Sequence, residues 1–505
     1  MSELLLGIDV GTYSSKGVLV RPDGKVLKSC VVEHTIDIPY PGWVEQDADA
    51  IWWGDVLKIC RNLLDGSPYR GENVAALAIS AIGPCMLPLD VAGKPLRPAI
   101  LYGVDTRATE EINYLNQKYG EEAIFDFSGM SLTSQAIGPK ILWMKNHEPD
   151  LWRKVDHVTT ASSYLIFKLT GEKVIDRHTA SHFMPLIDIR TLEWSDRYSD
   201  EIIEVSKLPE IKWSDEIAGT VNRTGAEATG LMPGTPVAVG AVDALSEAVS
   251  VGAVESGDLM IMYGSTTFFI LVLKNRISDW RMWTVAGAFP KQYCLAAGMA
   301  TTGSLTRWFR DELARDLAPD GAYQTLFSEA ENIEPGAGGL LLLPYFSGER
   351  TPINDPKARG IIVGLTLSHT RAHIYRAILE GIAYGICHNI ETFRAINANV
   401  DRVIAVGGGT KSKTWVQIVS DVAGIEQIIP EQTIGASYGD AFLAGLAIGM
   451  VQKTDLSQWV KPKYTITPIR TNHEYYQHQY KKFLELYEKT RDIVHDLEVS
   501  SRSSG

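Results

Sequence analysis

The chain has 505 residues, of which 45% are hydrophobic, and 48 Lys and Arg stand against 61 Asp and Glu, a formal net charge of −13. This length predicts two to four domains with substantial cores. The acidic balance without a basic run argues against nucleic acid or an anionic membrane as a partner and favours a small-molecule substrate.

The start of the chain shows neither a positively charged segment nor a long apolar stretch, and nowhere do eighteen apolar residues run together. We therefore expect no membrane span and a cytoplasmic protein. The five cysteines are never in C-x-x-C spacing, which predicts reduced thiols rather than a disulfide framework or a zinc site. The sequence leaves a homodimer open.

Residues 4–20, LLLGIDVGTYSSKGVLV, are two apolar runs separated by a polar tip. This pattern predicts a buried β-hairpin. The tip contains Asp9, Gly11, Thr12, Ser14 and Lys16. A carboxylate suits Mg²⁺, and glycine N–H groups with hydroxyls suit phosphate oxygens, so the tip predicts a site for a nucleotide phosphate and its Mg²⁺. The alternative is an ordinary hairpin with a solvated carboxylate.

A second copy of this pattern occupies residues 257–273, GDLMIMYGSTTFFILVL, with Gly264, Ser265 and Thr266 at its tip. Gly11 and Gly264 lie at numbers 11 and 264 of a 505-residue chain, so the pattern recurs at half-length and implies two similar halves. Two facing hairpins would hold a nucleoside triphosphate as in the duplicated actin-like ATPase fold. This arrangement also explains why the chain contains no Walker motif.

Further elements follow in the first half. Residues 48–64 predict a helix, 74–79 a strand ending at Ser80, and 99–101 a strand that leads to Asp105 and Arg107. Side chains just past such strand ends often contact ligands, so Asp105 and Arg107 are candidates for binding sugar hydroxyls. A helix cap or a surface ion pair is the alternative. Residues 139–195 are expected to be largely helical.

Residues 236–242 predict a buried strand that ends at Asp243, followed by a helix of small residues. A carboxylate at this place, with room for a ligand to approach, fits a general base. The alternative is that Asp243 only caps the helix it opens.

The second half contains three more turns between strands and helices. Residues 298–309 predict a turn at Gly303 that enters a helix, and residues 340–344 a strand leading to a charged loop. Residues 403–406 predict a strand that ends at Gly407, Gly408 and Gly409, before a helix from Ser412. Three glycines let the backbone lie against adenine or ribose, although a tight turn is the alternative. A last helix is followed by a tail, 496–505, that we expect to be disordered.

Together these stretches resemble the FGGY family of carbohydrate kinases, from residue 4 to about residue 451. The most specific motifs are G-I-D-V-G-T at 7–12, P-Y-F-S-G-E-R-T-P at 344–352, A-R-G-I-I-V-G-L-T at 358–366 and the helix over 373–380. The resemblance implies an α/β fold with two ribonuclease-H-like (actin-like ATPase) domains, 1–250 and 251–495, and an ATP and sugar cleft between them. It implies phosphoryl transfer from ATP, with Mg²⁺, to a small sugar or polyol.

The resemblance also implies a role for each candidate residue. Asp243 would be the catalytic base, and Asp9 and Asp243 would bind Mg²⁺. The sugar would be bound by Ile82, Gly83, Asp105, Arg107 and Asp243. The expected ATP site consists of Gly11, Thr12, Ser14, Lys16, Gly264, Ser265, Thr266, Gly303, Gly407, Gly408, Gly409 and Ser412.

The chain departs from the family pattern at two places. Its N-terminal signature is only partly present, because Ile137 stands where Pro, Ser or Thr is usual. The xylulokinase subgroup, which this chain resembles most, usually has Ser-Gly-Gln-Met-His-Gly where residues 80–85 read Ser-Ala-Ile-Gly-Pro-Cys, and this second departure concerns the substrate. D-xylulose is therefore the leading expectation, with ribulose, erythritol, glycerol and gluconate as alternatives. A non-catalytic actin-fold ATPase would lack Asp243, and a sugar-sensing regulator would need a helix-turn-helix arm that the sequence does not show.

Overall fold

The computed structural model describes residues 3–66, 68–318 and 320–502, and its contacts divide the chain into two compact units. Unit 1 comprises Met1–Ser256, Val272–Cys294 and Ile434–Lys461, and unit 2 comprises Gly257–Leu271, Leu295–Thr433 and Pro462–Gly505. The division into domains 1–250 and 251–495 stays a prediction, since each compact unit is assembled from several segments of the chain.

Unit 1 is built on a six-stranded sheet with the order β13-β14-β5-β1-β2-β3. The strands are β1 (Leu4–Val10), β2 (Ser14–Val20), β3 (Val26–Glu33), β5 (Val74–Ala81), β13 (Ile217–Thr220) and β14 (Pro236–Ala238). All seven residues of β1 are buried, as its apolar sequence requires of a central strand. β1 pairs antiparallel with β2 and parallel with β5, so the predicted first hairpin is confirmed.

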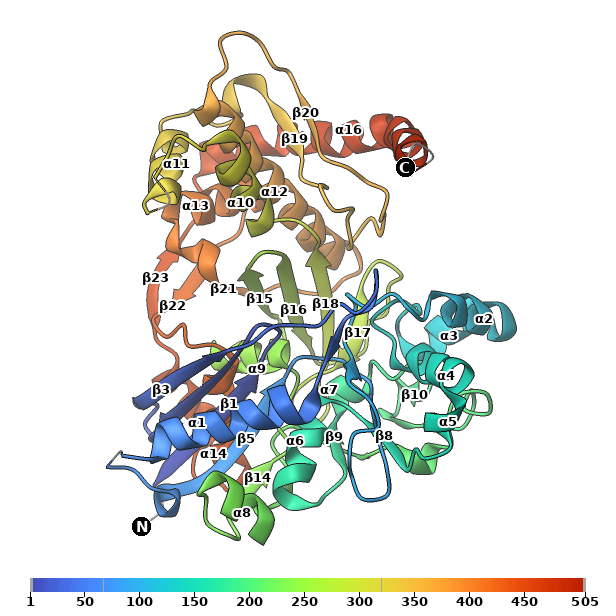
Figure 1. The fold of residues 1–505 in the computed structure, drawn as a ribbon. Helices are drawn as coiled ribbons and strands as arrows, with labels where there is room; N and C mark the ends of the chain where they lie inside the picture. Colours follow the sequence, from blue (N-terminus) through green and yellow to red (C-terminus); the bar gives the residue numbers. More distant parts are fainter. Residues whose placement is uncertain (1–2, 67, 319, 503–505) are drawn as a thin grey trace. The chain divides into compact units, whose positions relative to one another are not determined.

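The second sheet has seven strands in the order β17-β18-β16-β15-β21-β22-β23, and its edge strand is β17 (Trp283–Ala286) (Figure 1). Its strands are β15 (Asp258–Tyr263), β16 (Thr267–Leu273), β18 (Tyr293–Met299), β21 (Arg402–Val406), β22 (Gln427–Pro430) and β23 (Pro462–Ile466). β15 pairs antiparallel with β16 and parallel with β21, and β22 pairs antiparallel with β23. Strands β16, β15, β21, β22 and β23 thus have the same order and directions as β2, β1, β5, β14 and β13 of unit 1, which confirms the predicted hairpin repeat.

Helices surround each sheet (Figure 1). Unit 1 contains η1 (Ala48–Trp53), α1 (Gly54–Leu64), α2 (Thr109–Tyr119), α3 (Glu121–Ser128), α4 (Ile137–His147), α5 (Pro149–Trp152), α6 (Ala161–Thr170), α7 (Arg177–Ala180), α8 (Arg223–Thr229), α9 (Asp243–Ser250), α14 (Ala436–Ala447) and α15 (Leu456–Trp459). Unit 2 contains α10 (Gly303–Leu313), α11 (Ala322–Glu331), α12 (Arg371–Ala395), α13 (Lys413–Ala423) and α16 (Arg470–Arg502).

Helix α14 packs tightly in unit 1 because two glycines leave room for it. A Cβ atom at Gly7 of β1 would lie 1.8 Å from the Ser437 carbonyl oxygen, and one at Gly439 of α14 would lie 2.0 Å from the Ser246 carbonyl oxygen of α9. Such distances are far inside van der Waals contact, so glycine is required at both places. These contacts hold α14 against the central strand and against the helix that begins at Asp243.

Two expectations about secondary structure differ from the structure. Residues 139–195 contain short strands between their helices: β8 (His157–Thr159), β9 (Val174–Asp176), β10 (Ile187–Asp188) and β11 (Glu193–Trp194). Their β-branched residues favour extended backbone, which the helical expectation overlooked. Helix α16 runs through Arg502 and so includes most of the tail that we expected to be disordered; residues 503–505 lie outside the described part.

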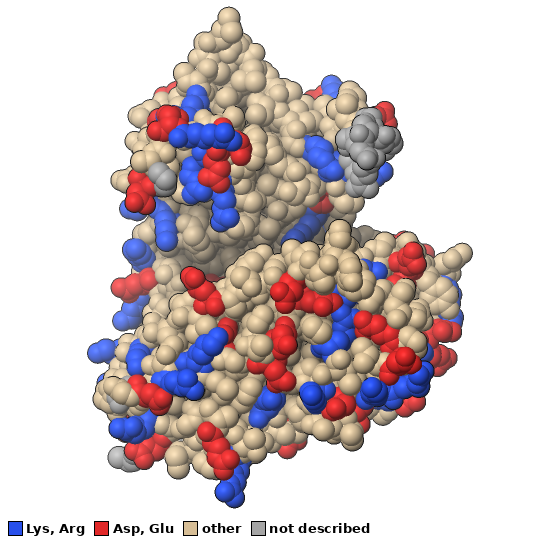
Figure 2. Space-filling model, viewed as in Figure 1, with Lys and Arg blue, Asp and Glu red and all other residues tan. Residues whose placement is uncertain are grey.

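The surface and the cysteines agree with the composition. Acidic and basic side chains are intermixed on the face shown in Figure 2. None of the described helices is long and apolar enough to cross a membrane. All five cysteines are free thiols, and four of them are buried, as predicted.

Candidate functional site

Two of the predicted site residues in unit 1 are carboxylates at the ends of secondary-structure elements. Asp9 lies near the end of β1 with only 8% of its surface exposed, and its Oδ1 accepts a hydrogen bond from Ser80 Oγ at 3.1 Å. Asp243 is half-buried at the first position of α9, where its Oδ1 accepts from the backbone N–H of Ala244 at 2.8 Å. Asp9 thus lies near a strand end and Asp243 begins a helix, as expected, but the strand predicted over 236–242 ends at Ala238, and only an isolated bridge at Val242 continues the pairing.

Burial and mutual repulsion raise the pKa of these carboxyl groups. Burial, with the charge of Asp9 next, raises the pKa of Asp243 to about 8. The same two causes raise the pKa of Glu247, one turn further along α9, to about 7. Burial raises the pKa of Asp9 to about 6, while Lys16 acts in the opposite direction. A cation near these groups would relieve the repulsion and favour their charged forms.

The Ser80 hydroxyl lies between the carboxyl groups of Asp9 and Asp440, and this arrangement also favours a positive charge there. Ser80 Oγ lies 3.1 Å from Asp9 Oδ1 and 2.6 Å from Asp440 Oδ2. Because the Ser80 hydroxyl has one proton and ionised carboxylates only accept, both contacts are hydrogen bonds at the same time only when one of the two carboxyl groups is protonated. Across the described part of the chain, no group of three or more His, Cys, Asp or Glu side chains could hold a metal ion.

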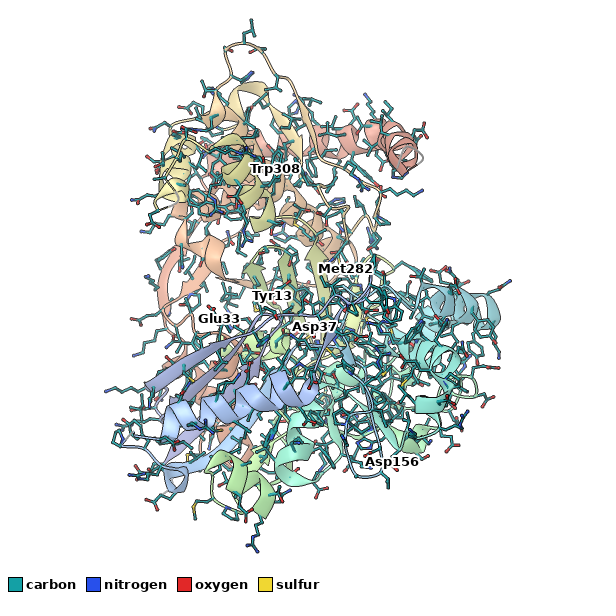
Figure 3. The ribbon with its side chains drawn as sticks, viewed as in Figure 1. Tyr13, Glu33, Asp37, Asp156, Met282 and Trp308 are labelled. Atoms are coloured by element: carbon teal, nitrogen blue, oxygen red, sulfur yellow. The ribbon has the colours of Figure 1, made fainter. Side chains whose placement is uncertain are left out.

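Hydrogen bonds from His34 connect the first hairpin tip to Asp55. The His34 ring contacts the Gly11 carbonyl oxygen through Nε2 at 3.0 Å and the Asp55 carboxylate through Nδ1 at 2.8 Å. A carbonyl oxygen can only accept, so Nε2 donates to Gly11. Gly11 N–H also closes the turn on the Ser14 carbonyl at 3.0 Å. Tyr13, labelled in Figure 3, is 62% exposed at this tip.

The other candidates near this tip lie in mixed surroundings. Thr12 Oγ1 is 3.3 Å from the Tyr102 hydroxyl, so its side chain is held in place. Ile82 is 1% exposed and belongs to the apolar core cluster of the unit, whereas Gly83 is half-buried. The Ile82 side chain thus packs into the core, and its contact with a sugar stays a prediction.

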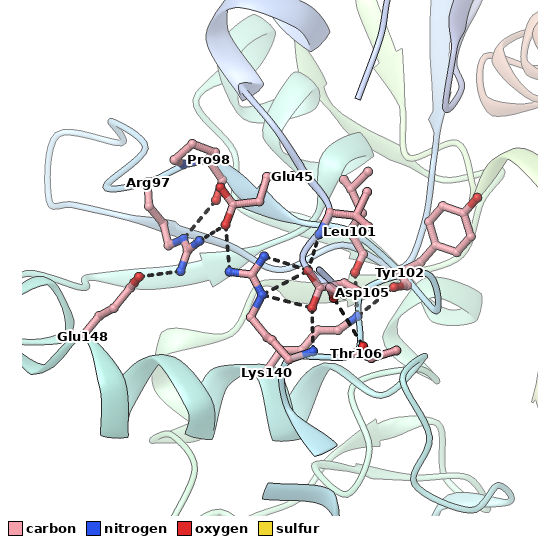
Figure 4. A network of polar contacts seen from close by, with 12 residues as sticks. Glu45, Arg97, Pro98, Leu101, Tyr102, Asp105, Thr106, Lys140 and Glu148 are labelled. Carbon is pink, nitrogen blue, oxygen red and sulfur yellow. Dashed lines mark hydrogen bonds and ion pairs between the residues drawn. The ribbon is translucent and has the colours of Figure 1, made fainter. Parts of the chain in front are cut away.

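Asp105 belongs to a buried network of polar contacts (Figure 4), in which it forms an ion pair with Arg107. The Asp105 carboxylate accepts from Arg107 Nη2 and from the Val44 backbone N–H, both at 2.7 Å, and both side chains are fully buried. Arg107 Nη1 donates to Glu45 at 2.7 Å, and its guanidinium lies 4.1 Å from the centre of the Trp43 ring. This geometry favours the ion-pair alternative, in a buried form, and sugar binding by either residue stays a prediction.

Unit 2 contains a cavity of about 850 Å³ with aromatic side chains in its wall. Trp415 is 3% exposed, and its ring centre lies 5.8 Å from that of Tyr263 and 6.4 Å from that of Phe327. The basic residues that line the cavity are Arg307, Lys411 and Lys413. A flat apolar wall with basic groups nearby suits a base and a polyphosphate, and the volume lies in the usual range for ligand pockets.

Three of the predicted adenosine-site residues line this cavity, namely Gly408, Gly409 and Ser412. A Cβ atom at Gly409 would lie 2.8 Å from Tyr263 Cβ and 2.9 Å from Trp415 Cζ3, so the close approach requires glycine. The Ser412 side chain caps α13 by accepting from the Trp415 backbone N–H at 3.2 Å. Gly407 is not among the lining residues and takes a left-handed conformation with φ +91° against Tyr263.

The second hairpin tip is joined to the start of α10. Gly303 N–H donates to the Gly264 carbonyl at 3.0 Å, and Ser304 N–H donates to the Ser265 carbonyl at 3.0 Å. A Cβ atom at Gly303 would lie 2.4 Å from the Gly264 carbonyl oxygen. Gly303 therefore permits the close packing of helix and tip. Gly264, Ser265 and Gly303 line the cavity, whereas Thr266 is not among its lining residues.

Family comparison decides the class of the protein. Residues 4–250 match the N-terminal domain and residues 259–448 the C-terminal domain of the FGGY family of carbohydrate kinases. The chain belongs to this family. The predicted membership is thus confirmed, and the protein is an ATP-dependent sugar kinase.

Individual relatives agree with the family match. The kinase is 28% identical over 495 residues to a xylulose kinase of Bacillus subtilis, covering 97% of each chain. It is 30% identical to a glycerol kinase of Nocardia farcinica, covering 90% of this chain and 92% of the relative. The crystal structure of a xylulose kinase from Rhodospirillum rubrum matches with a TM-score of 0.90 and 30% identity, over 97% of this chain and 100% of the other. The predicted actin-like ATPase fold is confirmed.

Several polar groups of the kinase were missed by sequence reasoning. Asp440 and Ser246 join the Asp9 surroundings, and Glu247 shares the repulsion around Asp243. Asp440 had a visible signal, because it is the only charged residue in α14, ASYGDAFLAGLA. Trp415 had none beyond its place three residues after Ser412.

Proposed function

We propose that this kinase transfers the γ-phosphoryl group of ATP to a hydroxyl of a ketopentose, with Asp243 as the general base and D-xylulose as the leading substrate. The relatives named xylulose kinase support the substrate class. The observation that carries the base assignment is the raised pKa of Asp243, about 8, at the half-buried start of α9. A base with a pKa near the working pH is effective in proton transfer.

The cavity of unit 2 supports the nucleotide part of the proposal. The wall beside the adenine ring would consist of Tyr263, Phe327 and Trp415. The backbone at Gly408 and Gly409 would lie against the nucleoside. The hydroxyl and N–H groups of the second hairpin tip, which lines this cavity, would donate to phosphate oxygens. Since this reaction passes through a loose transition state, positioning and charge neutralisation supply most of the catalysis.

Asp9 fits a role as a magnesium ligand, assisted by Asp243. Its carboxylate offers oxygen ligands and acts on the pKa of Asp243, which is also raised. It also accepts a hydrogen bond from Ser80, whose hydroxyl contacts Asp440 as well. Fewer than three protein ligands is the usual case for Mg²⁺, which keeps several waters and binds through one or two carboxylates. When bound, Mg²⁺ would neutralise charge on the phosphate oxygens. Lys16, close enough to act on the pKa of Asp9, would hold a second positive charge there.

The proton path follows from the residues of the chain. The ionised Asp243 would accept the hydroxyl proton of the sugar as the new phosphate ester forms. The Ala244 N–H donates to Asp243 Oδ1, which fixes the orientation of the carboxylate. Mutual repulsion with Asp9 and Glu247 raises the proton affinity of Asp243 and thus its strength as a base.

A small polyol such as glycerol is a second candidate substrate, supported by one observation. The segment that carries polar Gln and His in xylulokinases has Ile82 and Pro84 here, and both are buried. An apolar segment offers fewer partners, and each unpaired buried hydroxyl costs about 1 to 3 kcal/mol. The 30% identical glycerol kinase is consistent with this candidate.

An ADP-release screen tests these proposals. The acceptors are D-xylulose, D-ribulose, L-ribulose, L-xylulose, erythritol, glycerol and gluconate, each measured as kcat/KM with wild-type enzyme and with Asp243→Asn. The ketopentose proposal expects a pentulose to exceed glycerol and erythritol. If kcat/KM for a polyol exceeds that for every pentulose at least tenfold, the polyol proposal replaces the ketopentose proposal. ADP release by Asp243→Asn at the wild-type rate would contradict the base assignment.

A further inference from the structure

Asp440 is a buried carboxylate whose two oxygens contact two different elements of unit 1. It lies on α14 and has no exposed surface. Its Oδ1 accepts from Ser246 Oγ at 2.6 Å. Its Oδ2 contacts Ser80 Oγ at 2.6 Å and accepts from the Ser80 backbone N–H at 3.1 Å. The two hydroxyl contacts are short, and together the three contacts use both oxygens.

The two partners lead directly to the proposed catalytic carboxylates. Ser80 stands on β5 and donates to Asp9 at 3.1 Å. Ser246 stands on α9, three residues after Asp243, and so faces the same side of the helix. We propose that Asp440 is a positioning residue of the kinase: through Ser80 it fixes the carboxylate of Asp9, and through Ser246 it fixes the helix that carries Asp243.

A purely structural role explains this arrangement poorly. A carboxylate in the interior is costly to desolvate, and in α14 an alanine would be a better helix former. The neighbouring contacts of α14 already hold the helix closely, because Gly7 and Gly439 bring backbone against backbone. An apolar residue at position 440 would leave those contacts in place but would orient neither serine.

The expected effect follows from the number of donors and acceptors. Asp440→Asn keeps the size of the side chain but turns one acceptor into an NH₂ group. Its remaining oxygen can accept from Ser80 only if the NH₂ group faces Ser246 Oγ and donates to it, which reverses the present contact. One of the two links is therefore lost or reversed. Loss of a partner behind a metal ligand typically lowers metal affinity or activity about 10- to 100-fold.

The test compares Asp440→Asn with Asp176→Asn. Asp176 is also a buried carboxylate of unit 1, and its Oδ1 caps the short helix α7, where Asn is an equally good cap. Each variant is purified as the full chain and its melting temperature is recorded. Mn²⁺ affinity in the presence of ADP is then measured by electron paramagnetic resonance, and kcat and the Mg²⁺ concentration for half-maximal rate are measured with the best acceptor.

We expect Asp440→Asn to weaken Mn²⁺ binding and to lower kcat by about tenfold or more, while Asp176→Asn changes neither. Ser80→Ala should reproduce the loss of Mn²⁺ affinity, and Ser246→Ala should reproduce the loss of kcat with a smaller change in Mn²⁺ binding. For Asp176→Asn we expect at most a lower melting temperature. If Asp440→Asn also lowers only the melting temperature, the Asp440 carboxylate is structural and the inference is wrong.

The inference rests on the proposed function, but the two fail differently. If wild-type enzyme binds no Mn²⁺ with ADP, the role of Asp9 as a ligand and its positioning by Ser80 are both overturned. If Mn²⁺ binds normally and Asp243→Asn keeps full activity, the base proposal alone fails. Equal Mn²⁺ affinity and equal kcat in wild type and Asp440→Asn overturn the positioning role alone.

Discussion

The role of Asp243 can be tested by a substitution that preserves its shape. Asp243→Asn keeps an oxygen that can accept from the Ala244 N–H, now at 2.8 Å, but removes the ability to take up a proton. We expect kcat to fall by about 10² to 10⁴, the usual contribution of acid–base catalysis. Nucleotide affinity should hardly change, since the aromatic cavity of unit 2 is untouched.

The structure also sets the pH at which the effect should be seen. With a pKa of about 8, Asp243 is ionised in roughly one tenth of the ligand-free molecules at pH 7. The rate should therefore rise about tenfold per pH unit on the acid side and level off above the pKa. Because a bound cation favours the ionised carboxylate, the midpoint for kcat should lie below that of the free enzyme.

The assay is coupled ADP release from pH 5.5 to 9.5 with saturating ATP and acceptor. Glu247→Gln is a matched comparison, because Glu247 lies on the same helix and adds to the repulsion at Asp243. It should retain the pH-dependent rise and move the midpoint to lower pH. The reasoning would be refuted by an unchanged kcat in Asp243→Asn, or by the same pH-dependent rise in that variant.

Four further outcomes are expected. The raised pKa values of Asp9, Asp243 and Glu247 contribute stability below about pH 4, and this contribution is lost as the pH rises through about 6 to 8. Asp243→Asn should therefore raise the melting temperature more at pH 8.5 than at pH 5. Thr266→Val should weaken ATP binding by about 1 to 3 kcal/mol in calorimetry and leave sugar binding without nucleotide unaltered. Gly409→Ala should reduce ADP affinity at least tenfold, since its Cβ would collide with Trp415; unchanged affinity would contradict the assignment of the cavity. His34→Leu leaves the Gly11 carbonyl without its donor, and urea unfolding should show a loss of about 1 to 2 kcal/mol.

Local patterns account for what the sequence predicted well. Each hairpin is a continuous stretch of apolar residues with a polar tip, so residues 4–20 and 257–273 reveal it without any long-range information. The helix that begins at Asp243 and the glycines at 407–409, which follow a strand, are local in the same sense. Such features need only chain periodicity and turn chemistry.

Contacts between distant segments could not be predicted in this way. Ser80 and Asp440 are 360 residues apart, and only the folded sheet brings them together. Asp105 and Arg107 were expected to contact sugar or to pair at the surface, but Trp43 and Val44 from an earlier segment cover them. Spacing along the chain gives no information about which segment will cover an ion pair.

The two hairpins have the same topology but different chemistry, and this difference supports the different roles that we propose for them. The first tip carries Asp9 and Lys16 and is held from behind by His34. The second tip, Gly264 to Thr266, has no ionisable side chain and is held by backbone bonds to the start of α10. A charged tip can bind a cation and bias proton transfer, whereas a neutral tip can only donate hydrogen bonds to phosphate. Duplication thus explains the shared sheet, and divergence at the tips explains why substitutions at Asp9 and Thr266 should alter different steps.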